Sequence, residues 1–496
     1  MKKTLGALSF AAVAWLGSTA YIGSNIESQS EKLLGSMQEK YKKMGLDLKI
    51  EIKDKSFFTS KAVMTLNYKD KSMSELVGAI YNLPMQMDYE IEHGPVFFKN
   101  GVGVGLIRMH GDKSIISFLN EDLLDDIKLS KEDLVMKSTS VIDFSNHMVS
   151  NMTISALKYN DNYDMSIDVS EMKGHFDFDL DTMEGTAKLE TPLIKVYNPK
   201  QPTKDFVMVK DTTLNVNIDK FISDNIYLGG FTLQNKEITL AFSHLSKEPL
   251  VFLGDIDIQI EEDSDKNIKV LYKVDAEHLK GKIPEEAFPI AFDPKKVSFD
   301  LIVEGLSVKG LEAFQQYTIE IQKKTQELIE KLSAADSESR TLAFADLGAF
   351  QQEMQTKMID LGQDIFTPKK GKISLNLNIE DENKKNHHAN VSLAYIGEKL
   401  TGSMDEIMET FMLKAFESFK AKIDVSIEKS LITDFQKSLN SREQEQIGMG
   451  LMMGKAQGII VEKDGAYKVN ADYGPNKLIL NNKDMSEMIN MLKSSI

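Results

Sequence analysis

A chain of 496 residues is longer than the about 250–300 residues at which one hydrophobic core stops growing, so two or more lobes or one elongated sheet are expected. The net charge of −16, with Arg108, Arg340 and Arg442 as the only arginines, leaves no basic surface and argues against nucleic acid as a partner. The absence of cysteine excludes disulfides, thiolate metal sites and thiol nucleophiles.

The N-terminus carries Lys2 and Lys3 and then no charge over residues 4–26. Twenty such residues in a helix reach roughly 30 Å, which is enough to cross a bilayer, and the lysines place the N-terminus in the cytoplasm. We expect a membrane anchor over residues 1–24, a single span of a bacterial inner membrane with the bulk of the chain in the periplasm. The apolar anchor residues are Leu5, Leu8, Phe10, Val13, Trp15, Leu16 and Ile22. The alternative is a cleaved signal peptide, because residues 18–20 resemble a cleavage site.

Helical spacing continues over residues 25–44 and predicts a juxtamembrane helix. From residue 45 to residue 305 apolar residues alternate with polar ones, which is typical of antiparallel strands with one packed face and one wet face. Alternating segments occur at 46–52, 62–68, 85–91, 176–180, 214–218, 231–233, 256–260, 270–274 and 299–303. This region is predicted to form one large twisted sheet.

Apolar residues return to helical spacing over residues 306–370, where the polar stretch 335–340 divides the pattern into a helical hairpin. Strands are predicted again at 373–379 and 391–395, and a third helix over 404–439 through Phe411, Phe419 and Ile423. A hairpin, a strand at 478–480 and a short helix end an α+β region, 371–496, that we expect to pack on the sheet. The predicted fold is therefore α+β, with an anchor helix, a large antiparallel sheet and amphipathic helices covering one face.

Several short patterns resemble ligand-binding motifs but lack a residue that the motif requires at a fixed spacing. The tract of alternating glycine and valine at 101–105 lacks the third glycine of a phosphate loop and indicates a strand or turn that another backbone approaches closely. Asp177, Asp179 and Asp181 have the spacing that begins a calcium loop, but the glycine and glutamate that should follow are absent, so we interpret them as the polar face of a strand. No cofactor is expected.

Three further patterns have a structural interpretation as well as a functional one. His387 and His388 would point to opposite faces of an extended chain, which argues against a shared metal. Ser426 and Lys429 have Ser-x-x-Lys spacing without a companion motif. The methionine and glycine tract at 448–454 suits adaptable apolar binding, although core filling is the favoured interpretation.

Four stretches together resemble the YdgA-like family, inner-membrane and periplasmic proteins of Gram-negative bacteria with no settled function. The first contains Tyr21, Gly23 and Glu27; the second Phe57, Phe58 and Ser60; the third His93, Gly94 and Pro95; the fourth runs from 454 to 482. This chain has Ala20 where the family usually has an aromatic residue. The resemblance covers the whole length and implies location and architecture but no reaction. For His93 we favour a role in the turn that Gly94 and Pro95 form.

These observations predict a non-enzymatic envelope protein with a binding or scaffolding role, handling lipid or another apolar ligand. The alternative is a membrane-anchored module for protein interaction, including homodimer formation. A third hypothesis is an enzyme of unknown class whose carboxylates are brought together only by folding.

Overall fold

The computed structural model describes residue 38 and residues 46–495, with gaps at 70–73, 75–76, 122–128, 130–132, 161–164, 224–225, 243–247, 264–265, 282–293, 333–336, 400–405, 407–413, 415–416 and 476. The predicted anchor and, apart from Gln38, the predicted juxtamembrane helix lie outside the described residues. Among the helices that are described, none is both long and apolar enough to span a membrane. The chain divides into two compact units, Met1–Lys236 and Glu237–Ile496.

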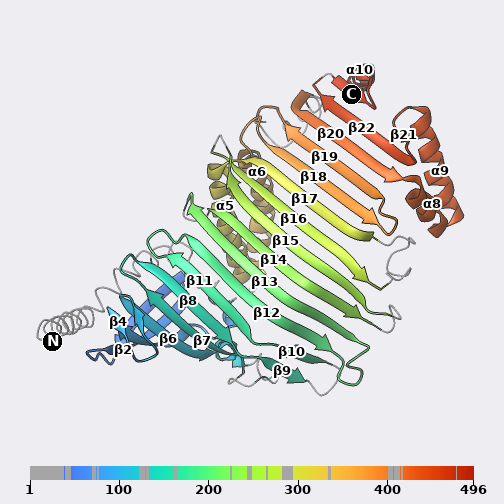
Figure 1. Cartoon of the computed structure of the whole chain (residues 1–496). Helices are drawn as coiled ribbons and strands as arrows, with labels where there is room; N and C mark the ends of the chain where they lie inside the picture. The colour runs from blue at the N-terminus through green and yellow to red at the C-terminus, as the bar shows by residue number, and fades with distance from the viewer. Residues whose placement is uncertain are drawn as a thin grey trace, which may run out of the picture. The chain divides into compact units, whose positions relative to one another are not determined.

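Most of the described residues of the N-terminal unit lie in strands (Figure 1). They are β1 (Leu46–Lys53), β2 (Thr59–Tyr68), β3 (Met85–His93), β4 (Val96–Phe97), β5 (Gly103–Val104), β6 (Ile107–Ser114), β7 (Val135–Ile142), β8 (His147–Ile154), β9 (Leu157–Asn160), β10 (Ser166–Val169), β11 (Met172–Asp179), β12 (Gly185–Tyr197) and β13 (Phe206–Phe221), with one 3-10 turn, η1 (Ile115–Phe118). The boundary between the units falls within β14 (Tyr227–Ala241).

Antiparallel pairing orders the main strands of this unit as β1, β2, β3, β6, β7, β8, β11, β12 and β13. The alternation in the sequence sets the register, because directly paired residues share a face of the sheet. Ile52 pairs with Ala62, and Ile91 with Met109, so one face is apolar. Its buried core is formed by Ala62, Ile91, Ile107, Ile142 and Leu180.

In the part of the C-terminal unit that the structure describes, a second run of antiparallel strands is accompanied by helices (Figure 1). The strands are β15 (Leu250–Glu262), β16 (Ile268–Lys280), β17 (Pro294–Leu306), β18 (Lys372–Asp381), β19 (Asn386–Tyr395), β20 (Phe419–Glu428), β21 (Val461–Lys463), β22 (Ala466–Gly474), β23 (Lys477–Leu480) and β24 (Lys483–Asp484). The helices are α5 (Val308–Leu332), α6 (Ser337–Ile365), α8 (Lys429–Ser438), α9 (Ser441–Ala456) and α10 (Ser486–Ser495).

The third predicted helix, 404–439, is wrong over much of its described length. Residues Phe419–Glu428 form β20, which pairs with β19 on one side and β22 on the other. Phe419 and Ile423 are four residues apart, which fits a helical face, but Ala421 and Val425 complete an alternating pattern that fits a strand equally well. Pairing on both edges favours the strand, so helical structure is confirmed only at the described residues 406, 414, 417 and 418 and again from Lys429, where α8 begins.

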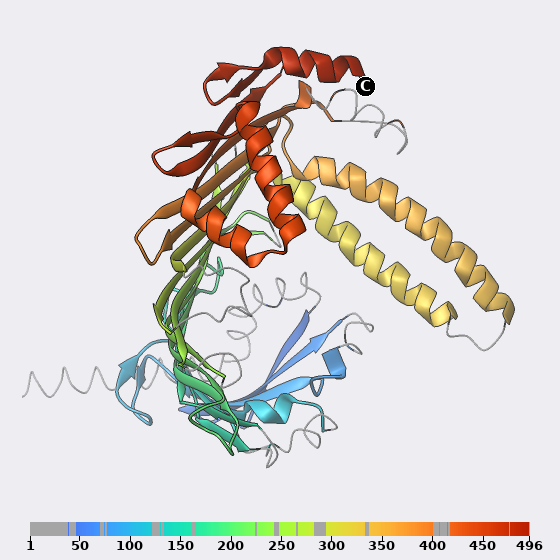
Figure 2. The ribbon, with the colours of Figure 1, turned by 90° about the vertical axis from the view of Figure 1, so that its right-hand side faces the viewer.

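The helical pattern at 306–370 corresponds to α5 and α6, which pack against each other through Tyr317, Leu328 and Phe350. Figure 2 shows this hairpin extending away from the sheet. Among the described elements its main packing contact is between its own two helices, and Asp364 near the end of α6 also binds Lys399 at 2.7 Å. Helices α8 and α10 contact the sheet at β20 and β23. The structure therefore differs from the expectation that amphipathic helices cover one face, because α5 and α6 use their apolar stripes to bind each other.

Candidate functional site

The connections between β1 and β2, between β3 and β6, and between β7 and β8 all lie at the same end of the strands of the N-terminal sheet. We call this end of the strands the edge. This follows from antiparallel pairing, since Thr59 pairs with Glu92, His93 with Ile107 and Ile107 with Ile142. Two of the family-like motifs, Phe57 to Ser60 and His93 to Pro95, are thereby brought together. Tyr21, Gly23 and Glu27 lie outside the described residues.

His93 is buried and holds the turn between β1 and β2 against the end of β3. Its Nδ1 lies 3.2 Å from the Phe57 carbonyl oxygen, which only accepts, so Nδ1 carries the proton and donates it. Its Nε2, 2.9 Å from Ser60 Oγ, then accepts the serine hydroxyl. The His93 backbone N–H donates to the Phe58 carbonyl at 2.9 Å.

A serine that donates to a histidine is also the geometry of an activated nucleophile. Ser60 and His93 are both about as deeply buried as any side chain in the described chain, at 1% and 2% exposed. A substrate could not reach the Ser60 hydroxyl without opening the turn. Burial lowers the pKa of His93, although the hydrogen bond to Phe57 acts in the other direction, so the ring is neutral near pH 7. The hydrogen bonds of His93 with Ser60 and with the Phe57 carbonyl therefore have a structural role, and we call them the lock.

Beside this lock, the connection between β3 and β6 folds back as the small hairpin β4–β5. Gly94 lies so close to Gly105 that a Cβ atom at position 94 would collide with the Gly105 carbonyl oxygen. The Gly94 N–H donates to Leu106 at 2.9 Å, and the Gly105 N–H to Pro95 at 3.1 Å. The glycine tract at 101–105 is thus a turn with close backbone contact, as predicted, and β5 is formed by its central residues.

The β4–β5 hairpin covers a buried ion pair between Glu92 and Arg108. Arg108 donates from Nε to Glu92 Oε1 at 3.2 Å and from a terminal nitrogen to Oε2 at 2.7 Å, and a further bond of 3.0 Å reaches the Gly101 carbonyl. The guanidinium also lies 4.9 Å from the centre of the Phe97 ring. Such a two-pronged pair needs arginine rather than lysine.

Two further donors complete the shell of the Glu92 carboxylate: Asn100 Nδ2 at 3.0 Å and His110 Nε2 at 2.9 Å. Burial raises the pKa of Glu92, but the hydrogen bonds from Arg108, His110 and Asn100 lower it by more, so that it lies below its usual value. The carboxylate stays charged and ties three segments of chain together.

Large apolar side chains project from the turns of this edge. Six side chains on its turns, from Phe57 at 43% exposed to Val102 at 82%, face outward. We call them the apolar edge: Phe57, Phe58, Phe98, Val102, Val104 and Phe144.

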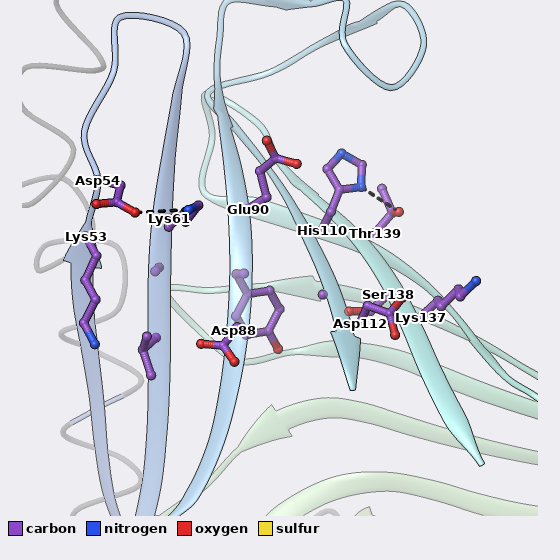
Figure 3. A pocket seen from close by; sticks show the side chains of 14 residues that line it. Lys53, Asp54, Lys61, Asp88, Glu90, His110, Asp112, Lys137, Ser138 and Thr139 are labelled. Atoms are coloured by element: carbon purple, nitrogen blue, oxygen red, sulfur yellow. Dashed lines mark hydrogen bonds and ion pairs between the residues drawn. The ribbon is translucent and has the colours of Figure 1, made fainter. Parts of the chain in front are cut away.

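A polar hollow of about 720 Å³ lies on the polar face of the same sheet (Figure 3). His110 lines this hollow and also contacts Glu92, and the Nδ1 atom of His110 lies 3.1 Å from Thr139 Oγ1. Lys61, a second lining residue, donates to Asp54 at 3.1 Å. Its charged lining includes Lys53, Lys137, Asp88, Glu90 and Asp112. The charges of both signs in this lining argue against a lipid site here. Within the described residues no group of three potential metal ligands converges.

The C-terminal unit carries a second apolar surface, on one face of the antiparallel run β15, β16, β17, β18, β19, β20 and β22. Paired positions repeat across these strands, for example Val303 with Ile373 and Ile373 with Leu393. We call this surface the aliphatic face: Ile256, Ile258, Ile260, Val270, Tyr272, Val274, Phe299, Leu301, Val303, Ile373, Leu375, Leu377, Ala389, Val391, Leu393, Ala421, Ile423, Val425, Val469, Ala471 and Tyr473.

The other sequence patterns have structural roles in the described chain. Asp177 pairs with His147 at 2.7 Å, and Asp179 accepts the backbone N–H groups of the following turn. His387 is buried and accepts from the Glu428 N–H, whereas His388 lies 3.4 Å from Asp424 on the opposite face of β19. The two histidines do not converge.

Two other patterns resolve differently. Ser426 lies in β20, and Lys429 begins α8 and binds Glu462. The tract at 448–454 lies in α9, where Met449, Met452 and Met453 are exposed, so the favoured interpretation of core filling is wrong for these side chains.

Sequence reasoning missed the cluster of Glu92, Arg108 and His110. A signal was present, because Arg108 is one of three arginines and Glu92 stands between Ile91 and His93 in a family-like motif. Their partnership depends on the β3–β6 register, which no local pattern supplies.

Fold and site together define a sheet-dominated α+β protein with a rigid apolar edge in one unit and an aliphatic sheet face in the other. The chain belongs to a family of bacterial proteins of unknown function, DUF945, which matches residues 1–488. This match does not confirm the narrower resemblance to YdgA-like proteins. No curated protein and no solved structure matches the chain significantly.

Proposed function

We propose that this chain is a non-enzymatic, membrane-anchored protein of the bacterial cell envelope that binds the acyl chains of lipid on its aliphatic face. The bulk of the chain lies in the periplasm, and residues 1–24 form a single span of the inner membrane. The anchoring rests on the charge-free residues 4–26 and the lysines before them.

The observation that carries the proposal is the exposure of apolar residues in the middle of the sheet. Ile373, Val391 and Leu393 are between 38% and 44% exposed, although β18 and β19 are paired on both sides. Apolar residues on the interior strands of a sheet are normally covered by a second layer of secondary structure. The obvious cover, the α5–α6 hairpin, extends away from the strands (Figure 2).

The size of the aliphatic face suits a lipid tail. Seven strands spaced at about 4.8 Å give a width of about 29 Å, and three apolar positions along each strand give a length of about 14 Å. One leaflet of a bilayer is about 15 Å of hydrocarbon. Ten methylenes taken from water would contribute about 8 kcal/mol before the cost of association.

The chemistry of the face favours acyl chains over a protein partner. Its members are mostly isoleucine, leucine, valine and alanine. Of the three residue types that dominate the binding energy of protein interfaces, arginine and tryptophan are absent from it, and tyrosine occurs at Tyr272 and Tyr473. Acyl chains need no hydrogen-bond partners. The charged and polar residues of the same strands, such as Asp257, Lys273 and Asp300, lie on the opposite face.

The test is to purify the full chain from membranes in mild detergent, to measure co-purifying lipid by mass spectrometry and to determine the protein mass by light scattering. Leu393→Asp places a carboxylate in the aliphatic face, and Ser392→Asp places the same group on the opposite face of the same strand. We expect wild type and Ser392→Asp to retain lipid, and Leu393→Asp to lose about tenfold or more, because burying a carboxylate costs more than the ~1.4 kcal/mol that corresponds to tenfold.

A lipid-free wild-type dimer that Leu393→Asp separates into monomers would assign the face to self-association. A lipid-free monomer that binds no hydrophobic dye would contradict both hypotheses and would favour a search for an enzyme. Thermal unfolding of both variants shows whether each one is folded.

A further inference from the structure

The apolar edge of the N-terminal unit is a second surface, distinct from the aliphatic face, whose exposure needs an explanation. Phe57 and Phe58 lie on the β1–β2 turn, Phe98 and Val102 on the β4–β5 hairpin, and Phe144 on the β7–β8 turn. Large apolar side chains therefore project from three separate turns at one end of the sheet. Soluble monomers rarely gather exposed apolar groups in this way without a binding role.

The three turns that carry these apolar side chains are held in place by polar contacts. The lock between His93, Ser60 and the Phe57 carbonyl fixes the first turn, and the Glu92–Arg108 pair fixes the hairpin through Gly101 and Asn100. In the third turn Asp143 Oδ1 accepts the N–H groups of Ser145 and His147 at 2.7 and 3.0 Å. The apolar side chains are therefore presented by an ordered framework.

The length of chain before β1 brings this edge within reach of the membrane. Residues 27–45, about 19 residues, connect the charge-free segment to Leu46, and even as a compact helix they would span about 29 Å. Strand β1, with 8 residues, is about 26 Å long and ends at the apolar edge. The tether can therefore run the length of β1 and leave that edge against the bilayer.

We propose that the apolar edge docks on the surface of the lipid bilayer, with its side chains inserted to a depth of about 5–10 Å. The docking rests on the membrane anchoring of the proposed function but not on lipid binding by the aliphatic face. Lys55 and Asp54 stand beside the phenylalanines, and Asp143 and Asp181 beside Phe144, so the edge carries both signs of charge. Insertion of apolar groups, rather than attraction to anionic lipid, drives the docking.

The absence of native cysteine allows a direct test. Val102→Cys and, as a control, Thr203→Cys are labelled in the full chain with an environment-sensitive fluorophore. Thr203 is exposed in the turn between β12 and β13, which lies at the opposite edge of the sheet. The labelled chains are reconstituted into vesicles of zwitterionic phospholipid, with a fraction of the lipid spin-labelled near the carbonyl groups.

We expect the label at position 102 to shift to shorter wavelength and to be quenched at least about twice as strongly as the label at position 203, because only position 102 reaches the interfacial depth. Adding 0.5 M salt, at which the Debye length is only about 4–5 Å, should change this little. In the Val102→Cys chain, Phe57→Ser and Phe58→Ser should together reduce the quenching.

Equal quenching of the two labels would overturn the proposal, as would quenching that requires anionic lipid. Protection of position 102 that appears only in native membranes, and not in vesicles of pure lipid, would assign the edge to a protein partner instead. Co-purified lipid reports on the aliphatic face and is unaffected by these outcomes, so failure of one proposal can be distinguished from failure of the other.

Discussion

At the scale of single residues, the Glu92–Arg108 pair is the most demanding feature of the fold. Both side chains are buried, and removing one partner of a buried ion pair leaves a charge without compensation. We expect Arg108→Met to lower the free energy of unfolding by about 3–5 kcal/mol, measured by urea denaturation. The double variant Glu92→Leu with Arg108→Met should recover much of this loss. A single variant that costs less than about 1 kcal/mol, the range of an exposed pair, would show that the pair is not buried in solution.

His93 gives a pH dependence whose sign follows from its environment. Its folded-state pKa lies below the usual value of about 6.5, so the unfolded chain binds a proton first as the pH falls. The stabilisation is present above about pH 6.5 and is lost as the pH falls towards the folded-state pKa. We expect His93→Gln to be less stable than wild type at pH 7 and to lose less stability between pH 6.5 and pH 5, measured by thermal unfolding. An identical pH profile for the two proteins would contradict this assignment.

At the scale of elements, alternation in the sequence was a good guide to the strands. It predicted β1 from Leu48 and Ile50 and β18 from Leu375 and Leu377, because a strand with one wet face leaves a period of two. Within Phe419–Glu428 the apolar residues fit both the helical period and the strand period, and only pairing with β19 and β22 decides between helix and strand. Local sequence could not supply that information.

The α5–α6 hairpin is inserted between two strands that pair with each other. Glu304 of β17 faces Lys372 of β18, and the Ser307 N–H donates to the Ile365 carbonyl at 2.7 Å, so the two ends of the insertion meet. We expect replacement of residues 308–365 by a short glycine turn to leave the β-sheet circular dichroism and the co-purifying lipid unchanged. Deletion of β18 and β19, which removes two interior strands, is the control that should abolish both. Loss of lipid from a folded hairpin-deletion variant would show that the helices contribute to the site.

At the scale of the whole molecule, the candidate surfaces depend on contacts that the sequence does not display. The apolar edge combines Phe57, Phe98 and Phe144, which are tens of residues apart, and it exists only because antiparallel pairing places their turns at one end. The aliphatic face was implied by the alternating strands, but its exposure was not, because helices with apolar stripes were expected to cover it. The preference of α5 and α6 for each other decides this, and it is a property of tertiary packing.

Lipid on the aliphatic face should also be visible as a change in the stability of the chain. A ligand that binds only the folded state stabilises it by RT ln(1 + [L]/Kd), which is about 2.7 kcal/mol at a concentration one hundred times Kd. The measurement is calorimetry with a short-chain phospholipid kept below its micelle concentration. We expect a higher unfolding temperature for wild type and for Ser392→Asp, and no shift for Leu393→Asp. A shift in all three proteins that Phe98→Ser and Val102→Ser remove would move the lipid to the apolar edge, and no shift in any of them would exclude acyl chains from the aliphatic face.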